Sequence, residues 1–406
     1  MIRHMNKSDI EDNKENIDMK NNEADLKKKS DDTDQKNKSA FIKNRYIASF
    51  LLYGLGDKIG FKNSDWKMDY GRPASAGTIN EFVYEFIDLG GINGIDLSNW
   101  NISAETFYNI SIAKSMLKYN GKTDKKFIVN VKNKLIESYN ESKMDLKNGI
   151  KRYDDDTTQK YLVMFTLDDD ARNKPYDSEA NGNGVVSRSI SIGLSLYKKE
   201  NLEELIETSI TLGKLTHNSP IGFLPGFTIA YFASLAINDI DITLWPHMMI
   251  KILESQMITQ YLDMTVQEIR FDYMDYVRYW KKYIDTRFVD TKPIKNRSTS
   301  NLIFRTRYYY ENFVKDTKIN GIGVSGFCAC IMAYDVLLDC DGKWEKIIFY
   351  GILNPSDSNV IGAICGGLYG AMYGLGDVPE HMLEHIEKGE ILFDLGKKIY
   401  KKFYLQ

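Results

Sequence analysis

Cysteine is scarce in this chain, and neither sign of charge dominates it. The 406 residues include four cysteines and no Cys-x-x-Cys pair. So few cysteines in so long a chain do not form a disulfide framework, and we expect free, buried thiols. The formal net charge of -3 gives no general attraction for nucleic acid or for an anionic membrane. We therefore predict neither as a partner.

Aromatic residues are absent from the first forty positions. Residues 1–40 contain no Phe, Trp or Tyr and are dominated by Lys, Asp, Glu and Asn. Such a segment cannot bury enough apolar surface to offset the entropy lost on ordering. It also lacks an apolar signal-peptide core and is rich in acids, which argues against a secretory signal and a mitochondrial presequence. We predict a disordered charged tail over 1–40, one folded domain over 41–406, and a cytoplasmic location.

Long runs of Val, Ile and Thr bounded by turns are missing as well. After position 41 the apolar residues recur mostly at helical rather than alternating spacing. The fold class is therefore predicted to be all-α, with one helix beginning at the N-cap residue Ser103. Two long uncharged stretches, 215–238 and 358–376, contain prolines or many glycines. We expect buried core helices there rather than membrane spans.

Glycine recurs at every fourth position near the C-terminus, at Gly362, Gly366, Gly370 and Gly374. A glycine in a helix interior costs about 1 kcal/mol relative to alanine, so a repeated glycine needs a compensating reason. The spacing predicts a helix whose backbone approaches another helix very closely.

Six segments combine small, acidic and histidine-containing motifs in a fixed order. They are Tyr53–Gly60 with its Gly56-Asp57 pair, Leu89–Trp100 followed by Ser103, Asn181–Leu194, Leu215–Pro220 with Thr216-His217, Gly326–Asp335, and Asn354–Val360. No single segment is specific, since short motifs recur by chance. Together, over almost everything after residue 41, they resemble the ADP-ribosylglycohydrolase family, most closely its ADP-ribosyl-arginine hydrolase branch. The resemblance implies a compact all-α fold that holds ADP-ribose in a cleft above two Mg²⁺ ions.

The resemblance also implies a set of metal ligands. Mg²⁺ prefers carboxylate, hydroxyl and water oxygens, and it could orient the ribose hydroxyls and activate a water molecule. At the positions where the family carries these ligands, this chain has Ser103, Glu105, Asp357 and Asn359. Glu105 and Asp357 are also the predicted catalytic residues. Ser103 could instead act only as a helix cap, and Asp357 only as an acceptor in a turn.

Three family ligand positions have lost their oxygen or their charge. Ala104 and Asn359 stand where the family has carboxylates, and Val360 stands where it has a hydroxyl. The missing charges weaken the attraction for a divalent cation. We therefore expect one Mg²⁺ rather than two.

Four further residues are predicted to bind the substrate. Asp57, in a predicted Gly-Asp turn, could be an outer carboxylate of the site or a cap of the next helix. Gly182 and Gly184 would let backbone N–H groups approach a diphosphate, and Arg188 could pair with a phosphate or with a neighbouring acid. His217 is expected to be a structural histidine in a turn.

The acidic runs 154–156 and 168–170 are interpreted as solvated loops. The resulting hypothesis is a hydrolase that removes ADP-ribose from arginine in modified proteins, with ADP-ribose or an ADP-ribosylated protein as its partner. The alternative is an inactive pseudoenzyme that binds ADP-ribose or acts as a scaffold.

Overall fold

The computed structural model describes residues 35, 37–66, 75–153, 155–167, 175–315, 317 and 321–405, with only the backbone at Arg297 and Ser298. The chain divides into two units, Met1–Asn44 and Arg45–Gln406. In the first unit, residues 35 and 37–44 are helical. The rest of the predicted disordered tail, and the acidic run 168–170, lie outside the described residues.

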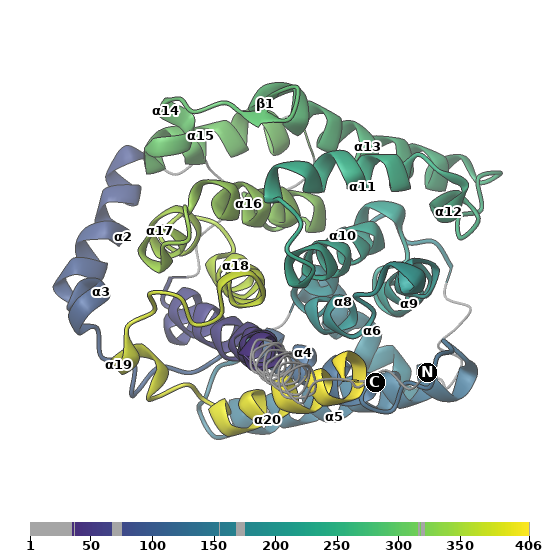
Figure 1. Cartoon of the computed structure of the whole chain (residues 1–406), viewed down its shortest axis with the longest axis horizontal. Coiled ribbons are helices and arrows are strands. Elements are labelled where there is room, and N and C mark those ends of the chain that lie inside the picture. The colour runs from purple at the N-terminus through teal and green to yellow at the C-terminus, as the bar shows by residue number, and fades with distance from the viewer. Residues whose placement is uncertain are drawn as a thin grey trace, which may run out of the picture. The chain divides into compact units, whose positions relative to one another are not determined.

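The second unit is built from helices, so the predicted all-α class is confirmed (Figure 1). Residues 45–61 form its first helix. The helices that follow are α2 (Ala76–Asp88), α3 (Gly91–Gly94), α4 (Ala104–Met116), α5 (Lys125–Lys147), α6 (Asp156–Leu167), α7 (Gly184–Ser187), α8 (Ile190–Ser195), α9 (Leu202–Lys214), α10 (Pro220–Ile237), α11 (Trp245–Leu253), α12 (Gln256–Thr259), α13 (Gln267–Arg287), α14 (Arg297–Ser300), α15 (Leu302–Phe313), α16 (Gly326–Asp339), α17 (Trp344–Ile347), α18 (Ser358–Tyr373), α19 (Glu380–Leu383) and α20 (Gly389–Ile399).

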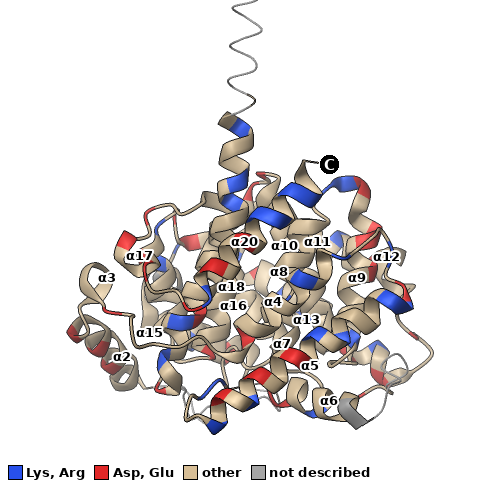
Figure 2. Ribbon diagram, turned by 90° about the horizontal axis from the view of Figure 1, so that it is seen from below, with Lys and Arg blue, Asp and Glu red and all other residues tan. Residues whose placement is uncertain are grey.

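Short elements complete the unit. Single helical turns span Lys62–Ser64, Lys199–Asn201, Ile242–Leu244, Ile348–Ile352 and Tyr400–Tyr404. The strands β1 (Phe288–Val289) and β2 (Lys292–Pro293) pair antiparallel, with Phe288 opposite Pro293. Basic and acidic residues are both spread along the ribbon in Figure 2, and α5, for example, carries residues of both signs.

The core lies where α10, α16 and α18 pack together, in the middle of Figure 1. Ser219 caps α10 by accepting a hydrogen bond from the backbone N–H of Gly222, and Pro220 occupies its first turn, where no N–H partner is needed. Among the described residues, α10 is the one helix long and apolar enough to cross a membrane, and 94% of it is buried. The four cysteines are free and buried, as predicted.

The glycines of α18 lie against the helix formed by residues 45–61. A Cβ atom at Gly366 would lie 2.0 Å from the carbonyl oxygen of Leu52, and one at Gly362 would lie 2.3 Å from that of Gly56. Both separations are far below a van der Waals contact, so only glycine permits this approach. The predicted close packing is confirmed, and Gly374, with φ of 68°, follows the last residue of the helix.

We expect Gly366→Ala to destabilise the protein by about 1–3 kcal/mol or more, because the added methyl group forces the two backbones apart. Urea denaturation would measure this change in the free energy of unfolding. Gly94→Ala is the matched control, because no atom lies within 4 Å of the Cβ that it would add. Equal stability of the two variants would contradict the proposed contact.

A buried ion-pair network joins α16 to α13 and α15. Arg287 of α13 donates to Asp335 at 2.6 Å and to Asp339 at 2.8 Å, and Arg305 of α15 donates to the same two acids. All four side chains are buried. Asp335, in the fifth segment of the family resemblance, therefore serves the packing of α13, α15 and α16.

Candidate active site

The N-terminus of α4 is held by a buried carboxylate from the first helix. Ser103 is the N-cap of α4, as predicted, and its Oγ accepts a hydrogen bond from the backbone N–H of Glu105 at 3.2 Å. The carboxylate of Asp57 accepts from the backbone N–H of Ser103 at 3.0 Å, from its hydroxyl at 2.6 Å, and from the Thr106 hydroxyl. Asp57 lies inside the helix of residues 45–61, so the turn predicted for it is wrong.

Asp57 is fully buried, and burial raises its pKa to about 6 although the donated hydrogen bonds oppose that shift. Through its bonds to Ser103 and Thr106, Asp57 holds the start of α4 in place. Its predicted contact with a substrate stays a prediction.

The N-terminus of α18 faces that of α4. Asp357 precedes α18, and within this fully described helix no backbone N–H donates to its side chain. Instead, the amide nitrogen of Asn183 donates to Asp357 at 2.7 Å and to the carbonyl of Gly323 at 2.7 Å. The amide nitrogen of Asn359 donates to Ser103 Oγ at 3.2 Å. This last bond joins residues 256 positions apart in the sequence.

Glu105 lies between these two helix ends and is 2% exposed. Its carboxylate accepts a hydrogen bond from the hydroxyl of Ser187 on α7. Burial raises the pKa of Glu105 well above its usual value, and the nearby charges of Asp155 and Asp357 raise it further, while Arg188 opposes them. Three acidic side chains therefore interact in one place, and Glu105 holds its proton more readily than Asp155 does.

Asp155 is the residue of this group that the sequence interpretation misplaced. It belongs to a run read as a solvated loop, yet its side chain is 11% exposed. The carboxylate accepts from the backbone N–H of Thr158 at 2.7 Å and lies 3.2 Å from Nε2 of His217. Against the effect of burial, His217 and Thr158 lower the pKa of Asp155 to about 2. Asp154 lies outside the described residues.

The Gly182–Gly184 segment makes room for this carboxylate. A Cβ atom at Gly182 would lie 2.3 Å from Oδ1 of Asp155, and one at Gly184 would lie 2.5 Å from Oγ1 of Thr158. Glycine is therefore required here because a side chain, rather than a ligand, occupies the space. The predicted approach of a diphosphate to these backbone N–H groups stays a prediction.

Arg188 and His217 are buried near the acidic residues Glu105 and Asp155. The Arg188 guanidinium is 2% exposed and donates to the hydroxyls of Thr158, at 3.3 Å, and Thr216. The Thr216 hydroxyl in turn lies 2.8 Å from Nδ1 of His217, which is fully buried, as expected of a structural histidine. Arg188 thus compensates buried negative charge at this site, and its predicted role as a phosphate ligand is untested.

The sequence model of the ADP-ribosylglycohydrolase family matches residues 38–406. The chain belongs to the ADP-ribosylglycohydrolase family.

Two curated relatives agree with this assignment. "Putative ADP-ribosyl glycohydrolase L444" of Acanthamoeba polyphaga mimivirus is 33% identical over 323 residues, which are 78% of this chain and 62% of the viral protein. "ADP-ribosylhydrolase ARH1" of Dictyostelium discoideum is 30% identical over 375 residues, which are 86% of this chain and 92% of that protein. This chain therefore spans less than two thirds of the viral relative.

A solved structure described as an ADP-ribosylglycohydrolase-related protein complex shares the fold. Its TM-score is 0.54 at 14% identity, and the match covers 89% of this chain and 99% of that chain. At this identity the likeness supports the fold alone.

The residues present do not fit the dinuclear Mg²⁺ site that the family resemblance implies for this chain. The Ser103 hydroxyl gives its hydrogen to Asp57, and its oxygen accepts from Glu105 and Asn359. One donated and two accepted bonds use the whole capacity of a hydroxyl. Asn359 turns its nitrogen, not its oxygen, toward Ser103. In the described part of the chain, no group of three or more His, Cys, Asp or Glu side chains is arranged to hold a metal ion.

A cavity of about 410 Å³ adjoins the acidic residues of the site. Its lining includes Lys143, Lys151, Tyr153 and Asp156. Tyr153 has φ of 42°, and burial raises its pKa, with further increases from Asp156 and then from Asp357. Tyr153 therefore lines the cavity and also lies near Asp357, one of the acidic residues of the site.

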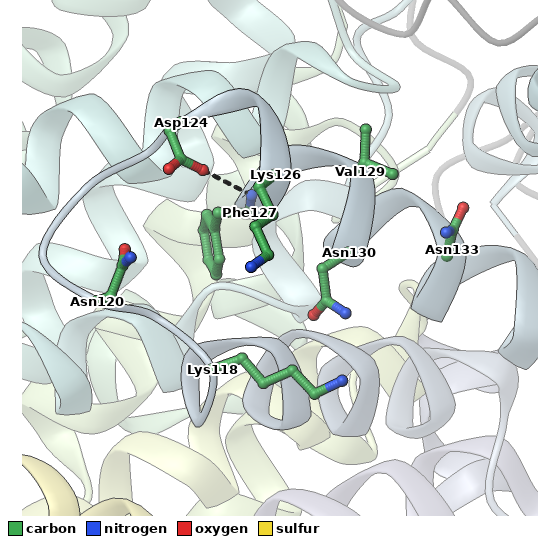
Figure 3. Close-up of a pocket in the computed structure, with 8 residues that line it drawn as sticks. All are labelled: Lys118, Asn120, Asp124, Lys126, Phe127, Val129, Asn130 and Asn133. Atoms are coloured by element: carbon green, nitrogen blue, oxygen red, sulfur yellow. Dashed lines mark hydrogen bonds between the residues drawn. The ribbon is translucent and has the colours of Figure 1, made fainter.

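A second cavity, of about 330 Å³, lies at the opposite end of α4 (Figure 3). It is lined by Lys118 after α4 and by the first turns of α5, where Asp124 accepts a hydrogen bond from the backbone N–H of Phe127 at 2.8 Å. Its lining residue Lys118 follows Glu105 by 13 positions, which correspond to about 20 Å at the helical rise of 1.5 Å per residue. This cavity is therefore not part of the acidic site.

The segment that carries Tyr153 and Asp155 is anchored on both sides. Arg152 donates to Glu387 at 2.6 Å and 2.7 Å and to the carbonyl of Ile102 at 2.8 Å. Its own carbonyl accepts from the N–H of Ala104 at 2.7 Å. The loop is therefore fixed to the start of α4.

We expect Asp155→Asn to lower the free energy of unfolding at pH 7 by about 2 kcal/mol. The pKa of Asp155 is lower in the folded chain than its usual value of 3.8, so its charge stabilises the fold above pH ~4 and loses this effect as the pH falls toward 2. The difference between variant and wild type should therefore shrink on acidification. Denaturant unfolding at pH 7 and pH 3 would measure it, with exposed Asp156→Asn as control. A difference independent of pH would contradict the ionised pairing.

Sequence reasoning missed Asp155, Asn183 and Ser187 as members of the site. Asn183 and Ser187 lie within a segment that was recognised, Asn181–Leu194, and their polar side chains close to Gly184 were the available signal. For Asp155 no comparable signal existed, because a run of acidic residues is usually a solvated loop.

Proposed function

We propose that this protein hydrolyses the N-glycosidic bond between ADP-ribose and arginine in modified proteins. The observation that carries the proposal is the buried Glu105, with its raised pKa, opposite Asp357 and beside the anionic Asp155. Glycosidic hydrolysis usually uses a pair of carboxyl groups, one of which holds its proton and acts as the acid. The Dictyostelium relative named an ADP-ribosylhydrolase supports the choice of reaction.

In this mechanism Glu105 is the general acid. Its carboxyl group donates a proton to the leaving guanidino nitrogen as the bond between that nitrogen and the anomeric carbon of ribose breaks. Asp357 accepts a proton from the water molecule whose oxygen attacks the same carbon, so the products are ADP-ribose and a protein whose arginine side chain is unmodified. The fixed negative charge of Asp155 stabilises the positive charge that develops on the ribose.

The second candidate function is binding of ADP-ribose without turnover. The bond between Asn359 and Ser103 favours it, because those side chains engage each other where the family has metal ligands. Ala104 and Val360 supply no oxygen at all from their side chains.

The decisive experiment is incubation of the purified full chain with a peptide ADP-ribosylated on arginine. Chromatography would measure the released ADP-ribose, with an active arginine hydrolase as positive control and Glu105→Gln as negative control. Release that depends on Glu105 supports hydrolysis. Calorimetric binding of ADP-ribose without release supports the second function, and neither binding nor release refutes both.

A further inference from the structure

The hydrogen-bond directions at the site can be assigned from valence alone. Ser103 has a single hydroxyl hydrogen, which the 2.6 Å contact assigns to the acceptor-only Asp57 carboxylate. Ser103 Oγ can then only accept from Asn359. The amide of Asn359 must therefore present N–H to it, since the reverse orientation would bring two oxygens together without a hydrogen.

The amide of Asn183 is oriented by the same reasoning. Its nitrogen faces two acceptors, the carboxylate of Asp357 and the carbonyl of Gly323, each at 2.7 Å. Both N–H groups are therefore used. Glu105 is likewise bonded by a neutral donor, the Ser187 hydroxyl. Three of the four residues predicted as metal ligands, Ser103, Glu105 and Asp357, thus accept a hydrogen bond from an N–H or O–H group of the protein.

Asn359 retains bonding capacity beyond its contact with Ser103. An amide carries two N–H donors and one carbonyl acceptor, and only one N–H is bonded to a residue that the structure describes. The side chain is 8% exposed at the start of α18, beside Asp357. One donor and one acceptor on the same planar group match the vicinal hydroxyls of a ribose.

We propose that the amide of Asn359 takes the place of a metal ion at this site and binds the ribose diol directly, so that ADP-ribose binds without a divalent cation. Asn183 and Ser187 complete the arrangement by fixing Asp357 and Glu105 in the absence of a cation. The proposal rests on the proposed function only in its ligand, ADP-ribose.

Calorimetry with ADP-ribose tests this dependence on metal. The full chain is titrated once in EDTA and once in excess Mg²⁺, and the two dissociation constants should agree within about twofold, since no ion enters the complex. Binding that needs Mg²⁺ would overturn the proposal. Absence of binding in both buffers would also overturn the proposal, and the release of ADP-ribose from the modified peptide then decides separately whether hydrolysis occurs.

Substitution of Asn359 is the second experiment that tests the proposal. Asn359→Asp removes the N–H donors and adds a charge, so ADP-ribose binding in EDTA should weaken by about tenfold or more. The variant should also bind Mn²⁺, followed by electron paramagnetic resonance with the metal alone, more tightly than wild type does. Asn133→Asp, at an exposed site on α5, is the control for added charge. Unchanged ADP-ribose affinity in Asn359→Asp, or tight Mn²⁺ binding by wild type, would overturn the proposal.

Discussion

Glu105→Gln is expected to reduce the release of ADP-ribose from modified arginine by roughly 10²–10⁴-fold, the usual contribution of general acid catalysis. Glutamine has nearly the same shape and can still accept the hydrogen bond from Ser187, but it carries no proton to donate. The folded protein already favours the uncharged form of Glu105, so the variant should be at least as stable as wild type near pH 7.

The pH profile distinguishes catalysis from a structural role. Because the protonated form of Glu105 is the active one, the wild-type rate should fall as the pH rises through its raised pKa. The residual rate of Glu105→Gln should lack that decrease. Glu137→Gln, the same change at an exposed position of α5, is the matched control. A Glu105→Gln enzyme with the wild-type rate and profile would remove Glu105 from the chemistry.

Ala104→Asp combined with Asn359→Asp is expected to make hydrolysis dependent on Mg²⁺ and at least about tenfold faster in its presence. The two carboxylates would restore the family's charged ligands, and a divalent cation contributes several kcal/mol to stabilising a developing charge. Position 104 lies in the first turn of α4, where the helix dipole also favours an acid.

The measurement is the hydrolysis rate with and without Mg²⁺ for wild type, each single variant and the double variant. Ala104→Asp alone should have a smaller effect, because the amide of Asn359 would still donate to Ser103. A double variant whose rate does not respond to Mg²⁺ would show that positions 104 and 359 do not converge on a metal. Circular dichroism of each variant checks that the helices are retained.

Much of the framework was predictable because it depends on local rules. The N-cap at Ser103, the buried α10 and the glycine contacts of α18 follow from capping chemistry, hydrophobic periodicity and the absence of a Cβ atom. That Glu105 and Asp357 lie close together could be predicted only from the family resemblance, because 252 positions separate them in the sequence.

The partners of the site residues were not predictable in the same way. Asp57 was placed in a turn because Gly-Asp is a frequent turn pair, whereas the glycine before it serves contact with α18. Gly182 and Gly184 suggested a phosphate loop because a glycine shows only that space is needed, not what fills it. Asp155 fills that space, and tertiary structure alone reveals it.

The contact between α18 and the first helix has a consequence for how this site can change over evolution. Backbone atoms of the two helices touch through Gly362 and Gly366, so neither helix can slide or rotate to accommodate a new ligand. Asp57 on one helix and Asn359 on the other are therefore held at a fixed separation. New chemistry can arise here only by exchanging side chains of similar size on an unchanged frame, and aspartate and asparagine are such a pair. Binding with or without a metal would then be separated by very few substitutions, while the fold itself stays the same.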